Sequence, residues 1–511
     1  MPQERGKCRS DRIRRAIIAT AITAGLAAAG SCRGTGGPQP AASSKVLRIG
    51  TAQLSATNPI VGLRQLSQLF SVEGLALPGE DGRMQPRLAE GWTPGNDGRS
   101  LTITLRPNAK FHDGSSVDAK AVAGTLPDAL RAYMGPVYSD VEYVRASAAG
   151  AVELGFRKAS PFLLESLEAV IQKPGSTVVG TGAFVAAPIV NSTTEMRANA
   201  EYYLGRPVVD TIHVESYPSV RSAWAEMLRG RIDFLYEVGA DALDSMEKSS
   251  TVSVFTFTQR FQFVIVLNQE SQVMRSPEIR RALNQGIDRA AVVRSALNGS
   301  GVASSGLVWP RSWALPPDLP KFEFDPKAAA DAVGRATHTT AGKAKKLHFT
   351  CLVPPDTVNE RIAIEVKRQL ASVGVDMDME QISQDQIVQR TTKKEYDAAL
   401  IQLISGPTLF RPYLIWHSKT PLNWADWGNT TVDTALDRVR EAPSEDQYRR
   451  AVGGLQQAFM DNPPAIFLAW SVRARAVSNR FVVPPPKAGV DVISTLRVWK
   501  PAAGAAQASQ N

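Results

Sequence analysis

Residues 97–119 read DGRSLTITLRPNAKFHDGSSVDA and carry the clearest local fold signal in this 511-residue chain. Leu101 to Arg106 alternates apolar and polar residues, which is the pattern of a strand with one buried face. Asp97-Gly and Asp113-Gly are tight-turn signals before and after it. From Val117 to Leu130 apolar residues recur at helical spacing. We therefore predict a turn, a strand, a second turn and a helix.

Outside this stretch, predicted strands alternate with predicted helices, which is typical of α/β domains. Helices are expected to begin at Ser276 and Asp325, because proline follows each at the first helical position and Asp325 also suits an N-cap. Gly230 is expected to end a helix over 219–229. The remaining predicted segments are strands at 46–51, 211–216, 232–236, 261–267, 346–353, 375–379 and 396–404, and a helix at 358–373.

The first residues have the features of an export signal. Six basic residues precede Ala16–Gly30, a run of fifteen uncharged residues rich in Ala and Ile. The run is shorter than the ~20 apolar residues of a membrane span and ends in small residues. Its end resembles a bacterial lipobox, with Ala29 where Leu is usual and a cysteine at Cys32, and a Gly/Pro/Ser-rich stretch follows. We predict a signal peptide at 1–31, lipidation of Cys32 and a flexible tether at 32–45. A plain secretory signal with an incidental cysteine is the alternative.

Charge and cysteine content exclude several classes of function. The 58 Lys and Arg residues exceed the 49 Asp and Glu residues by nine, and part of this excess lies in the signal segment. No basic cluster with interleaved aromatic residues is present, so we do not predict nucleic-acid binding. After Cys8 and Cys32 only Cys351 remains, which excludes an internal disulfide and a CxxC metal site in the mature chain. Cys351 lies in an apolar strand pattern and is predicted to be a buried hydrophobe.

Motifs for catalysis and for metal binding are missing from the sequence. No GxSxG, HExxH or phosphate-binding GxxxxGK[ST] pattern occurs. The five histidines (112, 213, 338, 348 and 417) are scattered without metal-ligand spacing, so we predict neither a metal site nor a cofactor. Only His417, beside Trp416, would justify a test with nickel.

Four blocks of sequence resemble the extracellular solute-binding proteins of family 5, which include dipeptide, oligopeptide and nickel receptors of ABC importers. The first block runs from RLAEGWTP at 87–94 through the opening stretch. The others are GTGAF at 180–184 with NAEYYLGRPVVD at 199–210, LRGRIDF at 228–234, and LN at 267–268 with PEIRRALNQGIDRAAVV at 277–293. A single block would be weak evidence, but all four stand in the family's order, and the resemblance covers roughly residues 46–500.

The resemblance implies an α/β fold, a two-lobed periplasmic-binding-protein-like (class II) clamp with an inserted extra subdomain. Its halves would close on a ligand at a hinge. The insertion would pack on lobe I. The expected parts are a discontinuous lobe I at 45–75, 176–262 and 478–500, the insertion at 76–175, lobe II at 263–477 and a disordered tail at 501–511.

The function implied is that of a substrate-binding receptor, not an enzyme. It would capture a small, peptide-like solute in the periplasm or another extracytoplasmic space and deliver it to separate permease and ATPase subunits. The resemblance also implies a monomer, held at the membrane by its lipid. The alternative is a non-transporting envelope lipoprotein that reuses the fold for regulation or scaffolding, which a short 119–160 region and an altered pocket would favour.

The family's cleft implies a ligand-binding segment at 404–429 of lobe II. The residues that we predict to bind the solute are Asn423, Trp424, Trp427, Trp416, Arg411 and, from a proline-bounded loop, Trp309. Tryptophans would supply stacking or packing surfaces. The alternative interpretation places the tryptophans in the lobe core and Arg411 on the solvated surface.

One departure bears on the choice of solute. Peptide-binding members carry an aspartate near the position of Gly406 to Thr408, which balances the ammonium group of the peptide. Here no acidic residue occurs between Asp397 and Asp426, and the segment offers Arg411 instead. A simple peptide ligand is therefore in doubt, and a less cationic, anionic or sugar-like solute becomes plausible, with Arg411 as a bidentate partner for a carboxylate. His112, in the Phe-His-Asp-Gly turn, is predicted to be a hydrogen-bonded structural residue.

Overall fold

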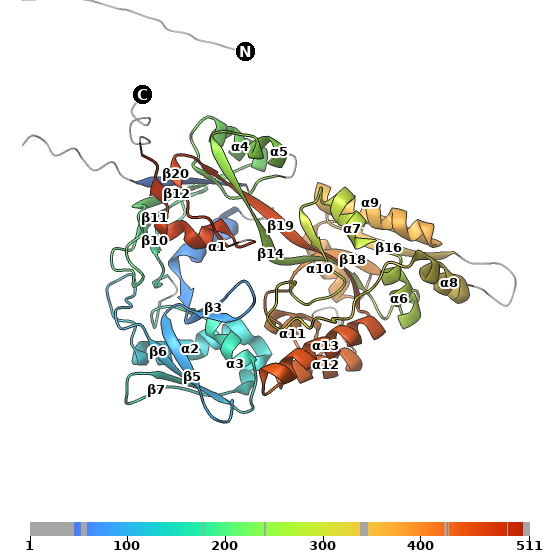
Figure 1. Ribbon diagram of the computed structural model, residues 1–511, viewed down its shortest axis with the longest axis horizontal. Helices are drawn as coiled ribbons and strands as arrows, with labels where there is room; N and C mark the ends of the chain where they lie inside the picture. Colours follow the sequence, from blue (N-terminus) through green and yellow to red (C-terminus); the bar gives the residue numbers. More distant parts are fainter. Residues whose placement is uncertain are drawn as a thin grey trace, which may run out of the picture. The chain divides into compact units, whose positions relative to one another are not determined.

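Two long antiparallel strands, β14 (Val252–Leu267) and β19 (Ala465–Ser478), connect the parts of the fold and lie side by side in Figure 1. They belong to an 11-stranded sheet in the order β10-β11-β12-β1-β13-β19-β14-β18-β16-β17, with β15 paired to β19. The strands on the β19 side form lobe I, and those on the β14 side form lobe II. The sheet is mixed, because β1 and β16 pair in parallel with their neighbours, whereas β14 and β19 pair antiparallel.

The computed structural model describes residues 45–52, 59–176, 178–239, 242–337, 346–423, 427, 429–487 and 489–503. The predicted signal peptide, Cys32, the tether up to residue 44, Trp424 and tail residues 504–511 lie outside this set. Within it, none of the helices combines the length and the apolar character that crossing a bilayer requires.

Lobe I forms around an apolar cluster in which Leu47 and Ile49 of β1 meet Ile212 and Val214 of β12. Both strands alternate buried and less buried positions, as their sequences predict. Its elements are β1 (Val46–Ala52), α1 (Pro59–Ser71), β2 (Glu73–Gly74), β10 (Phe184–Ala186), β11 (Thr193–Ala198), β12 (Thr211–Tyr217), α4 (Val220–Leu228), β13 (Phe234–Leu235), α5 (Leu243–Glu247), β20 (Phe481–Val482), a 3₁₀ helix (Val492–Val498) and β21 (Lys500–Pro501).

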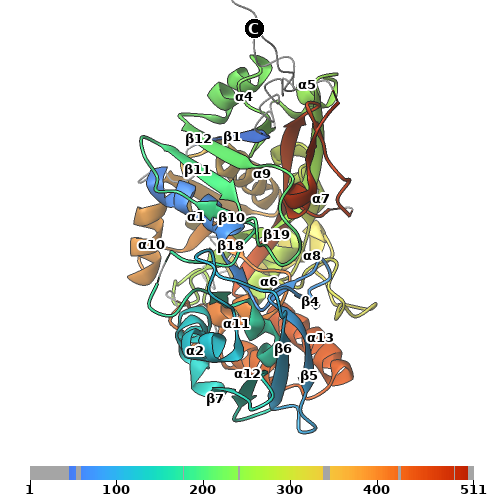
Figure 2. The ribbon, with the colours of Figure 1, turned by 90° about the vertical axis from the view of Figure 1, so that its left-hand side faces the viewer.

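The insertion has its own four-stranded antiparallel sheet, in the order β5-β6-β8-β7, with α2 against it (Figure 2). Asp118 caps α2 by accepting a hydrogen bond from the backbone of Ala121 at 2.8 Å, which explains where the helix begins. Its elements are β3 (Ala76–Pro78), β4 (Met84–Pro86), β5 (Ala89–Pro94), β6 (Ser100–Leu105), α2 (Ala119–Met134), a 3₁₀ helix (Gly135–Asp140), β7 (Val141–Ala146), β8 (Val152–Phe156), α3 (Phe162–Glu165), a 3₁₀ turn (Ser166–Glu168) and β9 (Val170–Ile171).

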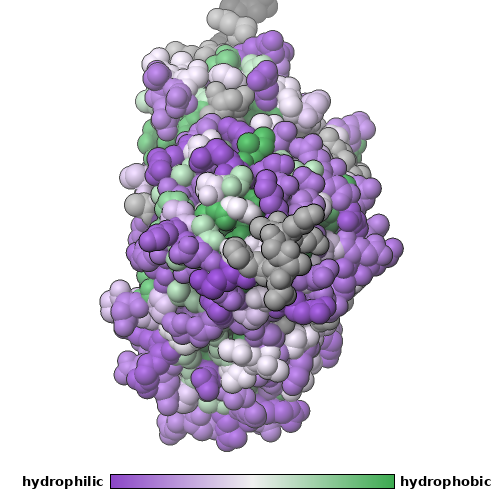
Figure 3. Space-filling view, turned by 90° about the vertical axis from the view of Figure 1, so that its right-hand side faces the viewer, coloured by the Kyte–Doolittle hydropathy of each residue, from purple (hydrophilic) through white to green (hydrophobic). Residues whose placement is uncertain are grey.

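Lobe II buries both faces of its part of the sheet, so its strands are apolar on both sides. One face packs under α6, α8 and α9, and the other under α11 to α13. Hydrophilic side chains cover most of the surface on the side that carries α8 and α9 (Figure 3). The elements are α6 (Pro277–Gln285), α7 (Arg289–Ala291), a π-helical turn (Val292–Ala296), β15 (Gly301–Ala303), α8 (Pro326–Thr337), β16 (Leu347–Val353), α9 (Thr357–Ser372), β17 (Val375–Gln381), α10 (Gln384–Thr392), β18 (Ala398–Ile404), α11 (Phe410–Trp416), α12 (Thr430–Arg440) and α13 (Glu445–Asp461).

The packing of the insertion differs from our expectation. It contacts lobe I through polar groups, such as the backbone of His112 bonded to Gly180 at 2.9 Å. Its apolar core, however, is continuous with that of lobe II. The ring of Phe162 meets that of Phe410 edge to face, with centroids 5.1 Å apart, and Arg440 pairs with Asp140 at 2.9 Å. The insertion therefore packs on lobe II with its apolar side, and not on lobe I alone.

Most predicted elements are confirmed within a few residues, and two differ in length. The strand predicted at 261–267 extends to Val252–Leu267, and the one predicted at 232–236 shrinks to Phe234–Leu235. The turns are confirmed by Gly98 and Gly114, whose positive φ angles of 67° and 84° suit glycine. Cys351 is fully buried, as its apolar surroundings predicted.

Candidate functional site

The crossing between the lobes contains a break in strand register. The pairing of β14 with β19 shifts between Thr258 and Gln262, so that residues 259–261 stand opposite Ser471 alone. Extra residues in one strand bend it and strengthen its twist. The two strands that connect the lobes can therefore change direction at this bulge, which makes it a candidate for the predicted hinge.

Two large apolar side chains are exposed beside the bulge. Phe261 and Ile404 are cross-strand partners on β14 and β18, and their exposed fractions are 39% and 36%. The exposure of Phe261 could not be predicted from the sequence, because the apolar residues of 261–267 do not reveal where the helices that cover the sheet end. The carbonyl of Arg260 next to it accepts a hydrogen bond from the backbone of Ser405 at 2.8 Å, which ties the bulge to the predicted ligand-binding segment.

The predicted ligand-binding segment begins with a cis peptide bond between Gly406 and Pro407. A side chain at Gly406 would overlap the ring of Trp309. Trp309 is 4% exposed and packs edge to face on Trp470, with ring centroids 4.9 Å apart. Its indole nitrogen donates to the carbonyl of Glu80 in the insertion at 2.7 Å. As placed, Trp309 supports the segment from beneath.

A buried carboxyl group of the insertion anchors the same segment. Glu165 is 8% exposed, and its Oε2 atom accepts a hydrogen bond from the backbone of Phe410 at 3.1 Å. The hydroxyl of Thr408 forms a second hydrogen bond to it. Burial outweighs these bonds and raises the pKa of Glu165 to about 8, so the carboxyl is mostly neutral at pH 7. An acid inside the apolar run of α3 was a signal in the sequence that we did not use.

A chain of contacts beside this anchor joins Arg260, Glu168, Tyr133 and Arg411. Glu168 accepts hydrogen bonds from Tyr133 at 2.8 Å through Oε2 and from Arg260 at 3.1 Å through Oε1. The guanidinium carbon of Arg411 lies 4.6 Å from the centre of the Tyr133 ring, a distance typical of a cation–π contact. Arg411 is partly exposed and forms no ion pair within the described part of the chain. The structure thus places Arg411 at the contact between the insertion and lobe II.

The tip of the β3–β4 hairpin, residues 79–83, binds lobe II. Arg83 forms a two-pronged pair with Glu445, at 2.8 and 3.2 Å. Glu80 forms an ion pair with Arg311 at 3.1 Å. Since these partners are hundreds of residues apart or lie on different elements, neither pair could be predicted from the sequence.

Arg311 also reaches lobe I. Its Nη2 atom donates to the carbonyl of Gly489 at 3.3 Å, and its guanidinium carbon lies 5.3 Å from the centre of the Trp309 ring. One side chain therefore connects lobe II with the insertion, through Glu80, and with lobe I, through Gly489. Movement of one lobe relative to the other would strain this junction.

Three predicted ligand-binding residues lie inside lobe II. Trp416 and Trp427 are 0% and 1% exposed, with ring centroids 5.4 Å apart. Asn423 is 4% exposed, and its Oδ1 atom accepts a hydrogen bond from the backbone of Trp427 at 2.8 Å. The indole of Trp427 donates to the hydroxyl of Tyr396 at 2.9 Å. As placed, these side chains shape the segment from within, and a contact with solute stays a prediction. Trp424 lies outside the described residues.

His112, predicted to be a hydrogen-bonded structural residue, and Arg280 of α6 both form hydrogen bonds to backbone carbonyls. The Nε2 atom of His112 bonds the carbonyl of Gly182 at 3.0 Å, and burial lowers the pKa of this histidine. Arg280 is 1% exposed and donates to the carbonyl of Pro463 at 2.7 Å. Among the residues that the structure describes, no three His, Cys, Asp or Glu side chains gather as a metal site would require.

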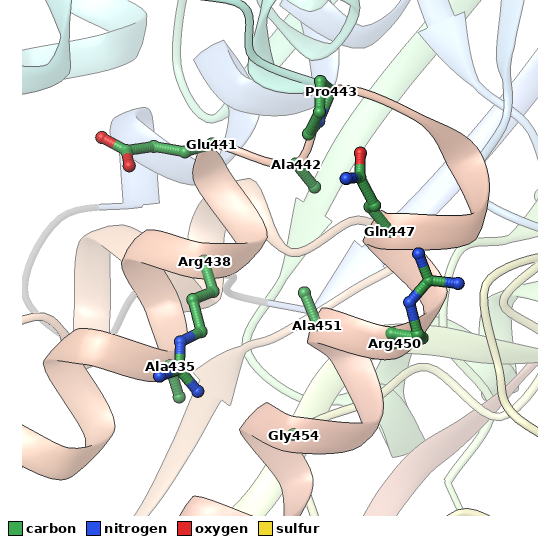
Figure 4. Close-up of a pocket in the computed structure, with 9 residues that line it drawn as sticks. All are labelled: Ala435, Arg438, Glu441, Ala442, Pro443, Gln447, Arg450, Ala451 and Gly454. Carbon is green, nitrogen blue, oxygen red and sulfur yellow. The ribbon is translucent and has the colours of Figure 1, made fainter.

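Lobe II also carries an open cavity of about 420 Å³ between α12 and α13, away from the predicted segment (Figure 4). Arg438 and Arg450 line it from the two helices, over a floor that includes Ala435 and Ala451. Small residues between packed helices leave such troughs. Glu441 at the rim pairs with Lys158 of the insertion at 3.2 Å.

Two lobes joined by a pair of bent strands, with an inserted subdomain beside them, define the class of two-lobed solute-binding receptors. The chain belongs to the bacterial extracellular solute-binding proteins of family 5, because the family model for the middle region matches residues 83–424, more than half of the chain. The sequence-based assignment of family and fold is thereby confirmed.

Individual relatives are more distant. The chain is 25% identical over 419 residues to the oligopeptide-binding protein AppA of Bacillus subtilis (strain 168), covering 75% of this chain and 77% of that one. It is 22% identical over 408 residues to the probable D,D-dipeptide-binding periplasmic protein DdpA of Escherichia coli (strain K12), covering 75% and 78%.

Solved structures share the fold at lower identity. NikZ of Campylobacter jejuni, in complex with Ni(L-His), superposes with a TM-score of 0.76 at 19% identity, over 89% of this chain and 99% of that one. The binding protein AgaA of A. tumefaciens R10, in complex with agropinic acid, superposes with a TM-score of 0.72 at 18% identity, over 90% and 99%.

Proposed function

We propose that this protein is the substrate-binding receptor of an ABC importer and captures a small, peptide-like solute by closure of its two lobes. The observation that carries the proposal is the register break at residues 259–261, which lets the two connecting strands bend. Family membership supports it, since two of the relatives named above, AppA and DdpA, are an oligopeptide-binding protein and a probable D,D-dipeptide-binding protein. The chain makes and breaks no bond; the energy for transport comes from separate permease and ATPase subunits.

The proposed solute site is the segment from residue 404 to 429 together with the loop that carries Trp309. Asn423, Trp424 and Trp427 would form one side, with Trp416 behind them and Arg411 at the end near the insertion. Phe261 and Ile404 add an exposed apolar surface at the hinge. Cleft closure would remove this surface from water, which favours the closed state by about 25 cal/mol for each Å² buried.

The proposal includes an attachment to the membrane through Cys32 and a monomeric receptor that needs no cofactor. The Gly/Pro/Ser-rich residues after Cys32 would act as a flexible leash, which lets the lobes reach the permease. The opposing hypothesis, a non-transporting envelope lipoprotein, shares the anchor and the fold but requires no solute.

A thermal-shift screen tests the proposal. The mature protein is heated with peptides, sugars, opines such as agropinic acid, and Ni(L-His), each in turn. A solute at 100 times its dissociation constant should stabilise the folded state by about 2.7 kcal/mol and raise the melting midpoint. Failure of the whole panel would favour the non-transporting alternative. Uptake of the solute that binds, lost on deletion of the cognate permease, then distinguishes a transport receptor from a sensor.

A further inference from the structure

The insertion meets lobe II through a buried aromatic contact. Phe162 of the insertion and Phe410 of lobe II are both 0% exposed, with ring centroids 5.1 Å apart, and the ring of Tyr413 lies 5.4 Å from that of Phe162. Tyr133 stacks on Phe410 from the insertion, with centroids 5.2 Å apart and ring planes at 9°. These rings belong to one apolar cluster that continues from the insertion into lobe II.

Polar contacts extend this interface on both sides of the aromatic rings. The hydroxyl of Ser160 donates to the backbone carbonyl of Arg440 at 2.6 Å, and the guanidinium of Arg440 pairs with Asp140 at 2.9 Å. At the hairpin tip, the backbone of Trp313 donates to the carbonyl of Asp81 at 2.9 Å. The contact therefore runs along the insertion from residue 81 to residue 162 and contains both apolar and charged pairs.

The contact between the insertion and lobe I is of a different kind. His112 bonds the carbonyls of Gly180, through its backbone at 2.9 Å, and of Gly182, through its ring at 3.0 Å. Lys110 pairs with Glu201 at 2.5 Å, and both side chains are partly exposed. A ladder of two residue pairs joins β2 to β9, next to the points where the chain passes between the two parts. This interface is mostly polar.

Among the described residues of lobe I, three reach the apolar cluster of the insertion. Leu75 does so where the chain enters the insertion, and Val179 and Tyr203 are partly buried at the edge of the cluster. Domains of one chain move relative to one another unless the interface between them is large and hydrophobic. The interface with lobe II meets this condition better than the interface with lobe I.

We propose that the insertion and lobe II form one rigid block, and that the clamp closes by movement of lobe I against this block. The inference rests on the proposed receptor function and describes how the same site is closed. The predicted ligand-binding segment belongs to the block, since Glu165 of the insertion accepts a hydrogen bond from the backbone of Phe410 at 3.1 Å. The solute then meets a surface that is formed before it arrives, and lobe I covers it. The register break at 259–261 and the short β2–β9 ladder are the pivots.

Three distances, measured by pulsed electron double resonance, test which parts move together. Spin labels are placed in pairs on cysteines that replace exposed residues, Lys120 in the insertion, Thr434 in lobe II and Gln65 in lobe I. The mature protein carries Cys32→Ser, and Cys351 is fully buried. Trialanine, agropinic acid and Ni(L-His) are added in turn. The distance from 120 to 434 should stay constant, and the distances from 65 to 120 and from 65 to 434 should shift together.

Variants test the block without any solute. Phe162→Ala removes the ring between Phe410 and Tyr413 and should broaden the distribution of distances from 120 to 434. Asp140→Arg, which places a second guanidinium beside Arg440, should do the same and serves if Phe162→Ala does not fold by circular dichroism. Lys110→Gln, at the contact with lobe I, is the matched control and should leave this distribution unchanged.

The outcomes distinguish failure of this inference from failure of the receptor proposal. A solute that changes the distance from 120 to 434 and leaves the distance from 65 to 120 constant would show that the insertion moves with lobe I. That result would overturn the rigid block and leave closure standing. An unchanged distribution in a folded Phe162→Ala or Asp140→Arg variant would also overturn the block. If a solute raises the melting midpoint and none of the three distances changes, closure itself is overturned.

Discussion

Replacing Glu165 by glutamine should change how the stability of this protein depends on pH. The carboxyl lies between α3 of the insertion and the start of α11, where it accepts a hydrogen bond from the backbone of Phe410 at 3.1 Å. Glu168, from the adjoining turn, and Tyr448, from α13, are the titratable groups that interact with it most directly. Glutamine keeps the size and the accepting oxygen of the side chain but cannot ionise.

The size of the expected change in the free energy of unfolding follows from the pKa of Glu165. Burial raises the pKa of Glu165 from an ordinary 4.5 to about 8 in the folded protein. One pKa unit corresponds to about 1.4 kcal/mol, so the difference amounts to roughly 5 kcal/mol in the free energy of unfolding. The folded state binds the proton more tightly than the unfolded state. The contribution of Glu165 to the free energy of unfolding is therefore fully present below about pH 4.5. It decreases by up to about 1.4 kcal/mol for each pH unit as the pH rises, and it is lost above about pH 8.

Urea unfolding, followed by tryptophan fluorescence at several values between about pH 4.5 and pH 8.5, measures this dependence. The free energy of unfolding of the wild type minus that of Glu165→Gln should fall by roughly 5 kcal/mol across the range. Asp128→Asn, which changes a largely exposed carboxyl on α2, should leave the profile of the wild type unaltered. Parallel pH profiles for the wild type and Glu165→Gln would refute the assignment of a buried, neutral carboxyl.

Three further predictions concern the junction, the site and the anchor. Gly489→Ala should cost about 1–2 kcal/mol of stability, because Gly489 has a φ of 77° and a Cβ atom there would overlap Arg311; an unchanged urea midpoint would contradict this. Trp424→Ala should weaken binding of the solute found in the screen by about tenfold or more, while the far-ultraviolet circular dichroism spectrum is retained. Unchanged affinity by calorimetry would favour the alternative, in which Trp424 belongs to the lobe core. Cys32→Ser should abolish incorporation of a clickable palmitate analogue and move the protein from the membrane fraction to the soluble one, whereas continued labelling would exclude Cys32 as the acylated residue.

Local patterns were sufficient to predict most elements of the fold. The strand at β6 and the helix α2 follow from alternation and helical spacing in 97–130, and the caps at Asp118 and Ser219 lie where short polar side chains precede an apolar run. The lengths of β13 and β14 could not be predicted from these local patterns. A strand ends where its hydrogen-bonded neighbour ends, and that neighbour, β19, is more than two hundred residues further along the chain.

The candidate site also combines residues that the sequence predicts with contacts that only the tertiary structure shows. Arg411 was predicted as a ligand-binding residue because the family resemblance implies a cleft at 404–429 and no acidic residue occurs near it there, and its contact with a solute stays a prediction. Its partner Tyr133 comes from the insertion, and Glu165 could have been noticed only as an acid within an apolar helix. The tryptophans were predicted as a group of aromatic residues, but composition does not tell which side of a segment faces the core. The structure buries Trp416 and Trp427.

By itself the sequence determined the family, the order of the strands and helices and the features of an exported chain, because these depend on residues close together or on motifs in a fixed order. Tertiary structure alone decided that the insertion shares an apolar core with lobe II, that the register of β14 against β19 breaks at residues 259–261, and that the carboxyl of Glu165 is buried against the backbone of Phe410. Each of these depends on groups brought together from distant parts of the chain. Their energies arise from burial and from the distance between charges, and neither quantity exists until the chain has folded.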